Sequence, residues 1–96
     1  VNGDGKNVKS LTLSDDSELT TDALFVFVGI IPNSELVKDF AELEGGFVKT
    51  DDRMRTSVPG LFAAGDVRTT SFRQVVTAAG DGAAAAHQAD EYIQNL

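Results

Sequence analysis

The sequence contains no cysteine among its 96 residues. A chain without cysteine forms no disulfide and no zinc–thiolate site, and it carries no thiol redox chemistry of its own. Any disulfide exchange in which this chain takes part therefore needs thiols from outside it.

Long apolar runs and positive charge are also scarce. No stretch reaches the roughly 20 apolar residues that cross a bilayer, and no basic segment followed by an apolar one stands at the N-terminus. The 8 Lys and Arg residues are outnumbered by 15 Asp and Glu residues, for a formal net charge of −7. Nucleic-acid binding depends on clustered cations, so we expect a cytoplasmic chain that contacts neither nucleic acid nor membrane.

The N-terminal residues predict antiparallel strands joined by turns. Val1–Lys6 reads as a hairpin turn, and Val8–Leu13 alternates apolar and polar residues like a half-buried strand. Because the strand before this turn is almost missing, we expect a piece of a longer protein. The spacing of Asn2 and Asp4 does not match a calcium loop, so no metal site is predicted. Ser14–Thr21 is polar and predicts another turn.

Three segments in the middle of the chain carry strand or helix signals. Ala23–Val28 is a continuous apolar run rich in β-branched and aromatic residues, which predicts a central strand covered on both faces. Ser34 is placed to cap a short helix that runs to about Phe40. A glycine pair then precedes Phe47–Thr50, which predicts a short strand.

The stretch from Thr56 to Asp66 is the centre of the sequence. Pro59-Gly60 is a turn signal, and the apolar run Leu61–Ala64 suits a strand buried on both faces. Gly65-Asp66 ends that run with a carboxylate. Ligands of open α/β sheets bind at the carboxyl edges of strands, where an acid accepts hydrogen bonds from a ribose or ribitol hydroxyl. Asp66 is therefore a candidate binding residue, although a plain Gly-Asp turn explains the same residues.

A long helix is predicted from about Phe72 to the end of the chain. Its start follows Asp66 closely, so the free N–H groups and positive dipole end of its first turn should lie near the carboxylate and favour an electron-rich group. Residues at spacings of three and four place one apolar face on this helix. They are Phe72, Val75, Ala79, Ala83, Ala86, Ala89, Ile93 and Leu96.

Four residues inside this helix call for an explanation. Gly80 and Gly82 each cost about 1 kcal/mol relative to alanine in a helix interior. Tight packing against a sheet and close approach of a cofactor explain the glycines equally well. Asp81 is expected to be solvated or paired locally. His87, the single histidine, has no Cys, Ser or acid partner placed by sequence for a catalytic triad and is expected to have a surface or packing role.

Several motifs together resemble one enzyme family. The string from Met54 to Val67, followed by Arg73-Gln74 and then by Ala78–Gly82, is similar to the C-terminal part of bacterial-type thioredoxin reductases. These are class II members of the pyridine nucleotide-disulfide oxidoreductase family. The resemblance extends upstream through Gly29–Asn33. The Arg-Gln pair resembles thioredoxin reductases more than the related peroxiredoxin-reducing or ferredoxin-NADP reductases.

The resemblance implies a fold and a division of the chain. The fold would be α/β, part of an FAD/NAD(P)-binding fold with a small mixed sheet and one long C-terminal helix. Residues 1–28 would be the C-terminal strands of an NADPH-binding domain, and residues 29–96 the C-terminal half of an FAD-binding domain. The whole protein would use FAD and NADPH to reduce the disulfide of a thioredoxin-like protein.

The resemblance also implies the site residues. Asp66, together with Gly65, would bind the ribitol of FAD. Arg73, Gln74 and Val75 would lie against the pyrimidine end of the isoalloxazine, mostly through backbone groups. The family often has alanine where Val75 stands.

Two parts of the family's machinery are missing from the chain. It contains no G-x-G-x-x-G loop for a pyrophosphate and no Cys-x-x-Cys, so the chain alone is expected to be inactive. Two alternatives remain: a non-catalytic flavin- or nucleotide-binding module, and a self-associating structural piece. Exposed strand edges would favour a homo-oligomer in either case.

Overall fold

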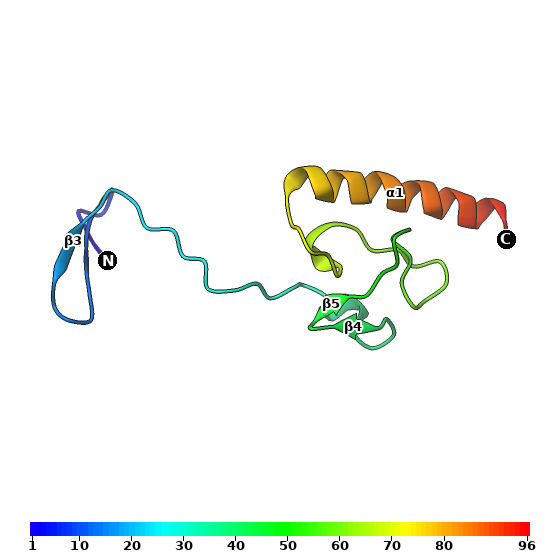
Figure 1. Ribbon diagram of the computed structural model, residues 1–96, viewed down its shortest axis with the longest axis horizontal. Coiled ribbons are helices and arrows are strands. Elements are labelled where there is room, and N and C mark those ends of the chain that lie inside the picture. The colour runs from blue at the N-terminus through cyan, green and yellow to red at the C-terminus, as the bar shows by residue number, and fades with distance from the viewer.

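The computed structural model describes all 96 residues, which form two parts joined by an extended segment (Figure 1). The chain measures 64 × 25 × 23 Å, with a radius of gyration of 20.2 Å. A compact domain of this length has a radius of gyration of about 13 Å. The chain is therefore far from spherical.

The N-terminal part is a three-stranded antiparallel sheet in the order β1-β2-β3. β1 is Asn2–Gly3, β2 is Val8–Thr12 and β3 is Glu18–Thr20. The Asp4 carboxylate stabilises the first turn by accepting hydrogen bonds from the N–H groups of Lys6 (2.9 Å) and Asn7 (2.8 Å). The predicted hairpin is confirmed, whereas a turn through the whole of Ser14–Thr21 is wrong because its last residues form β3.

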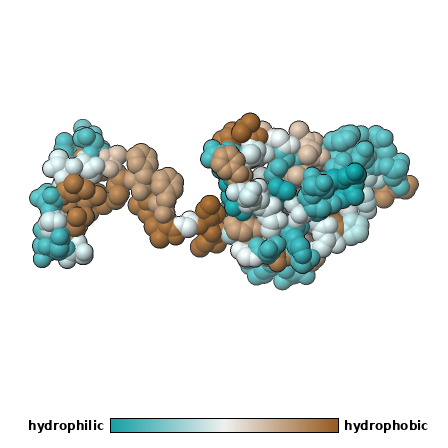
Figure 2. Space-filling model, in the orientation of Figure 1, coloured by the Kyte–Doolittle hydropathy of each residue, from teal (hydrophilic) through white to brown (hydrophobic).

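The segment after β3 is extended but pairs with no strand. The prediction of a central strand over Ala23–Val28, covered on both faces, is wrong for this chain. Phe27 and Val28 are each 89% exposed, and Ile31 is 92% exposed. In Figure 2 this segment forms the connection between the two parts, and it is predominantly brown, the colour of hydrophobic residues. Its apolar composition fits a buried strand, but nothing in the chain covers it.

The C-terminal part begins with a single 3-10 turn, η1 (Glu35–Val37), and a β-hairpin. The hairpin joins β4 (Leu43–Glu44) to β5 (Phe47–Val48) through Gly45 and Gly46, whose φ angles of 58° and 88° suit glycine. The short strand predicted at Phe47 is confirmed at its first two residues. The helix predicted from Ser34 to about Phe40 is confirmed only as the short η1, with Ser34 at its N-cap position. The predicted side-chain cap is wrong, because the Ser34 hydroxyl donates to the Gly46 carbonyl instead.

Residues 61–64 form no regular strand and are only half-buried. Phe62 makes an isolated antiparallel bridge with Arg55, and the Ala63 N–H donates to the Met54 carbonyl (3.0 Å). The predicted strand buried on both faces is therefore wrong in this chain. The segment instead leads into η2 (Gly65–Val67), a second 3-10 turn that carries Asp66.

The long C-terminal helix is α1 (Val75–Gln94), which lies along one side of the C-terminal part (Figure 1). Its existence is confirmed, but its orientation differs from the prediction. Most of the predicted apolar face is exposed, including Val75 at 88%. Gly80 and Gly82 face open space, so neither packs against a sheet of this chain. The residues of α1 that are half-buried are instead Thr77, Ala78, Asp81, Ala84, Ala85, Gln88 and Ala89.

The α/β class, with small sheets and one long C-terminal helix, is confirmed. The hydrophobic core is small and comprises Ala41, Val48 and Met54. Val48 belongs to β5, whereas Ala41 and Met54 stand in the loops before and after the β4–β5 hairpin. None of the helices has the length and apolar character needed to cross a membrane.

Candidate functional site

Asp66 lies in the three-residue turn η2, beside the start of α1. Gly65 begins the turn with a φ of 77°, a conformation that favours glycine, and its Cα faces Ala78 of α1. The Asp66 side chain is exposed, and its carboxylate oxygens form no hydrogen bond within the chain. The predicted proximity of acid and helix start is thus confirmed, and the carboxylate is open to solvent.

Arg73 connects the η2 turn to the β4–β5 hairpin. Its guanidinium donates from Nε to the Asp66 carbonyl (3.2 Å) and from Nη2 to the Arg68 carbonyl (3.2 Å). It also lies 4.0 Å from the centre of the Phe47 ring, a cation–π contact. The Arg73 side chain is therefore occupied within the chain, which leaves backbone groups to face a ligand.

Gln74 is the N-cap residue of α1. Its N–H donates to Thr77 Oγ1 (3.0 Å), and its carbonyl accepts from the Ala78 N–H (2.9 Å). The N–H groups of Val75 and Val76 belong to the first turn, where an α-helix offers no carbonyl partner. These groups and the helix dipole favour an electron-rich group at this end of α1.

These residues line one open cleft of about 330 Å³ at the start of α1. Its lining consists of Asp66, Arg73, Gln74, Val75 and Ala78. Four of the five residues predicted for the site are therefore brought together. The fifth, Gly65, does not line the cleft and lies behind Asp66 against α1.

Arg68 and Asp81 join the same region and were missed from the sequence. Asp81 Oδ2 accepts from Arg68 Nη1 (3.2 Å) and from the Gly65 N–H (3.1 Å). The partner of Asp81 is 13 residues away, so the prediction of a solvated or locally paired carboxylate is wrong. An acid at helical spacing from Ala78 and Ala85, on a face of small residues, is the signal that points to such a contact.

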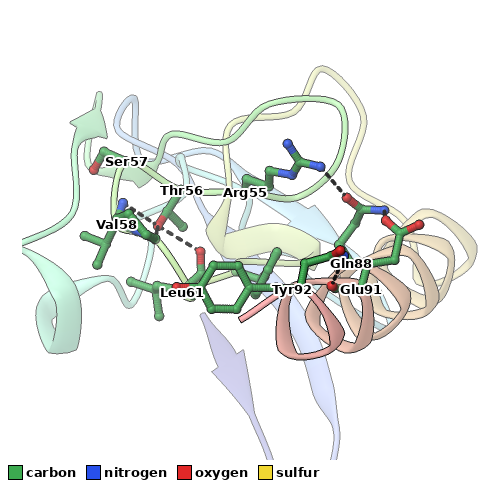
Figure 3. A pocket seen from close by; sticks show the side chains of 12 residues that line it. Arg55, Thr56, Ser57, Val58, Leu61, Gln88, Glu91 and Tyr92 are labelled. Atoms are coloured by element: carbon green, nitrogen blue, oxygen red, sulfur yellow. Dashed lines mark hydrogen bonds between the residues drawn. The ribbon is translucent and has the colours of Figure 1, made fainter.

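A second cavity, of about 450 Å³, lies near the C-terminal end of α1 (Figure 3). Arg55 reaches across from the loop, where its Nη2 donates to Gln88 Oε1 (2.9 Å), and Gln88 Nε2 donates to Glu91 Oε2 (2.8 Å). Tyr92 lies over the loop and meets Phe62 edge to face, with ring centres 6.3 Å apart. These contacts attach the loop before η2 to the far end of α1.

His87 is exposed on α1, with its Nε2 3.6 Å from Glu91 Oε1. No nucleophile contacts it, in keeping with the surface role expected from the sequence. No three of the His, Asp and Glu side chains gather in a way that could hold a metal ion.

Comparison with known proteins identifies the family. Residues 1–82 match the model of the pyridine nucleotide-disulphide oxidoreductases. The chain is 51% identical over 89 residues to the thioredoxin reductase of Treponema pallidum, covering 93% of this chain and 29% of that protein. It is 45% identical over 103 residues to the thioredoxin reductase of Listeria innocua, covering 98% and 31% of the two.

Solved structures give the same result. The thioredoxin reductase of Streptococcus pyogenes matches with a TM-score of 0.76 and 41% identity over 83% of this chain and 26% of that one. The thioredoxin reductase of Lactococcus lactis matches with a TM-score of 0.72 and 40% identity over 100% of this chain and 34% of that one. The chain thus spans about a third of the length of these relatives. It belongs to the pyridine nucleotide-disulphide oxidoreductase family.

Proposed function

We propose that this chain supplies one side of the flavin site of an FAD- and NADPH-dependent thioredoxin-disulfide reductase. The observation that carries the proposal is the cleft in which Asp66, Arg73, Gln74 and Val75 meet at the start of α1. The relatives that are named thioredoxin reductases support the reaction class. In this proposal residues 1–28 belong to an NADPH-binding domain and residues 29–96 to an FAD-binding domain.

The residues of the cleft fit part of a flavin. The Asp66 carboxylate is exposed and free of hydrogen bonds within the chain, so its oxygens can accept from the hydroxyls of a ribitol. The first-turn N–H groups of Val75 and Val76 can donate to the oxygens and nitrogens of a flavin pyrimidine. Because Arg73 is held by two carbonyls and Phe47, it shapes the cleft rather than reaching into it.

The chain contributes binding, orientation and electrostatics to this reaction. FAD, when bound, supplies the hydride chemistry between NADPH and a disulfide. Asp66 would fix the position of the ribitol, and the start of α1 would stabilise negative charge at the pyrimidine end of the ring. The dipole of a 20-residue helix acts mainly within its first turn, which is where Val75 lies. We expect this end of α1 to raise the flavin reduction potential.

The exposed apolar surfaces support the assignment to a larger protein. The extended segment 23–31 and the outer face of α1 expose large side chains, including Phe27 and Ile93. Monomeric proteins rarely expose contiguous apolar patches of this kind. We propose that the rest of a longer chain covers both surfaces, with the extended segment as a strand of its sheet.

Substitution of Asp66 tests the proposed function. The protein for this test is a chimaera of the Treponema pallidum thioredoxin reductase in which this chain replaces the matching third. Asp66→Ala should weaken FAD binding about 10- to 100-fold, because a hydrogen bond to a charged group contributes about 1.5–3 kcal/mol. The dissociation constant is measured by titrating the apoprotein with FAD and following flavin fluorescence.

Asp52→Ala is the matched control, since Asp52 is an exposed acid in a turn outside the cleft. It should bind FAD as tightly as the unsubstituted chimaera. Equal FAD affinity for Asp66→Ala and Asp52→Ala would reject the proposed role of Asp66.

A self-associating structural piece is the second candidate, and the unpaired segment 23–31 favours it. FAD binding by the chimaera distinguishes the two candidates, because a purely structural piece would supply no flavin contacts, and the colour of the purified chain shows whether it binds flavin alone. A yellow chain that keeps flavin through gel filtration would show binding without the rest of the protein. A colourless chain, with FAD bound only in the chimaera, supports the proposed function.

A further inference from the structure

We propose that the Arg68–Asp81 ion pair is a positioning device that fixes the Asp66 carboxylate opposite the start of α1. The inference rests on the proposed flavin site and adds two residues to it. Neither residue lines the cleft. Both would act on the ligand through the η2 turn.

Asp81 ties the turn directly to the helix. One carboxylate oxygen, Oδ2, accepts from the Gly65 N–H at 3.1 Å and from Arg68 Nη1 at 3.2 Å. Gly65 and Arg68 lie on either side of the Asp66-Val67 dipeptide. The two ends of the turn are therefore held by the same atom of α1, and the position of Asp66 follows from them.

Arg68 extends the link to a third segment. Its Nε donates to Thr50 Oγ1 (2.8 Å), beyond the end of β5, and its backbone bridges to Val48 in the parallel sense. A single guanidinium thus joins the hairpin region, the turn and α1. Its planar fork of donors suits this task better than the point charge of a lysine.

The pair is sheltered from water, in contrast to the other ion pairs of the chain. The side chains of Arg68 and Asp81 are 12% and 18% exposed. The side chains of the other four ion pairs are between 46% and 82% exposed. Exposed pairs are screened by water and contribute little, whereas a sheltered pair with several hydrogen bonds holds its geometry.

The turn is anchored by polar contacts, and besides the ion pair these include the Arg73 guanidinium, which donates to the Asp66 and Arg68 carbonyls. None of the residues of η2 is buried, and Asp66 itself is exposed. Gly65 faces Ala78 of α1 but has no side chain to pack against it. Polar contacts therefore set the position of the carboxylate, and Arg68 and Asp81 provide the best sheltered of them.

The test measures FAD affinity in the chimaera. Arg68→Ala and Asp81→Asn should each raise the FAD dissociation constant about tenfold, a change equivalent to about 1.4 kcal/mol. The matched control is the exposed pair of Lys49 and Glu42, 2.8 Å apart, which does not touch the turn. Glu42→Ala should change the dissociation constant less than about twofold, as expected for an exposed pair. An unchanged affinity in Arg68→Ala and Asp81→Asn would overturn the proposal.

A double-mutant cycle separates positioning from general stability. If the pair acts through Asp66, Arg68→Ala and Asp81→Asn should shift the dissociation constant less than about twofold when Asp66 is already alanine. The same tenfold shift in both backgrounds would mean that the pair only stabilises the fold, and would overturn the proposal. An Asp66→Ala variant that binds FAD normally would instead reject the proposed function.

Thr50→Val keeps the test available if the charge variants do not fold. It leaves the ion pair intact and removes only the hydrogen bond from Arg68 Nε. It should raise the dissociation constant about two- to threefold, as the loss of about 0.5 kcal/mol does. That shift should disappear in the Asp66→Ala background, and its persistence there would count against positioning.

Discussion

Gly60 illustrates how a single residue controls the loop that leads to the site. Its φ angle is 83°, and an added Cβ would lie 3.0 Å from Tyr92 Cε1 and 3.3 Å from Tyr92 Cζ. The glycine thus meets two separate demands, a backbone conformation that side chains disfavour and the close approach of an aromatic ring. Tyr92 in turn packs against Phe62, four residues before Asp66.

Gly60→Ala should therefore destabilise the folded chimaera by about 1–3 kcal/mol, through a strained φ and displacement of Tyr92. Gly80→Ala is the comparison, because Gly80 lies in α1 with open space around it. That substitution should stabilise the protein by up to about 1 kcal/mol, the difference in helix propensity. Urea unfolding followed by circular dichroism measures the free energy of unfolding of both variants. A Gly60→Ala variant that is more stable than the unsubstituted protein would contradict the strain argued for Gly60.

At the residue scale, the sequence predicted those features of the site that depend on residues close together in the chain. Asp66 and the start of the helix were predicted because nine residues or fewer separate them. The pairing of Arg68 with Asp81 was missed because it depends on how α1 lies against the turn.

At the scale of elements, the Asp51–Arg55 turn shows how one carboxylate can hold a buried residue in an unusual conformation. Asp51 Oδ1 accepts from the N–H groups of Arg55 (2.9 Å) and Arg53 (2.8 Å). Met54, inside the turn, is buried and has a φ of 62°. The Arg55 N–H, followed by the Arg53 N–H, holds the pKa of Asp51 below its ordinary value.

The turn should therefore weaken in acid. A carboxyl whose pKa is lowered by folding contributes stability above its unfolded pKa of about 4, and this contribution is lost as the pH falls through the lower folded pKa. Carbon-13 NMR of the Asp51 carboxyl in the folded chimaera should give a lower midpoint than in a peptide of residues 49–57. Equal midpoints in protein and peptide would show that the turn does not use these hydrogen bonds.

The elements also show where sequence patterns stop being informative. α1 was predicted because helix formation depends on local propensity and on the absence of proline after Pro59. The face of α1 that packs against the rest of the chain was not predicted. Small residues such as Ala78 and Ala85 pack inward, while longer ones such as Val75 stay outside. The strands at Ala23–Val28 and Leu61–Ala64 were predicted from composition, but a strand exists only with a partner. The chain supplies no sheet for either segment.

The whole molecule has far more apolar surface than core. Only 5 of its 96 residues are buried, and two of these are serines. A core this small gives little stability to an isolated chain, since stability grows with the fraction of surface buried. The exposed segment 23–31 is an unpaired, extended and apolar stretch, the kind that pairs with another chain.

The isolated chain should therefore self-associate at micromolar concentration. Light scattering after gel filtration should give a mass above that of one chain, because strand pairing covers the exposed segment. The double variant Phe25→Lys/Phe27→Lys should have a mass closer to that of one chain, since charged side chains oppose the pairing of strand edges. Asp22→Lys, just before the segment, is the control and should leave the association unchanged. A monomeric unsubstituted chain across the concentration range would contradict this expectation.

The hydrogen bond between Gly65 and Asp81 closes a loop of only 16 residues. Short loops cost little entropy to close, and contacts between near neighbours form early when a chain folds. The acid-bearing turn can thus dock on the first turns of its helix before any distant part of a polypeptide arrives. One wall of the cleft is thus encoded in a single short segment, and it can form before the residues that would face it are in place.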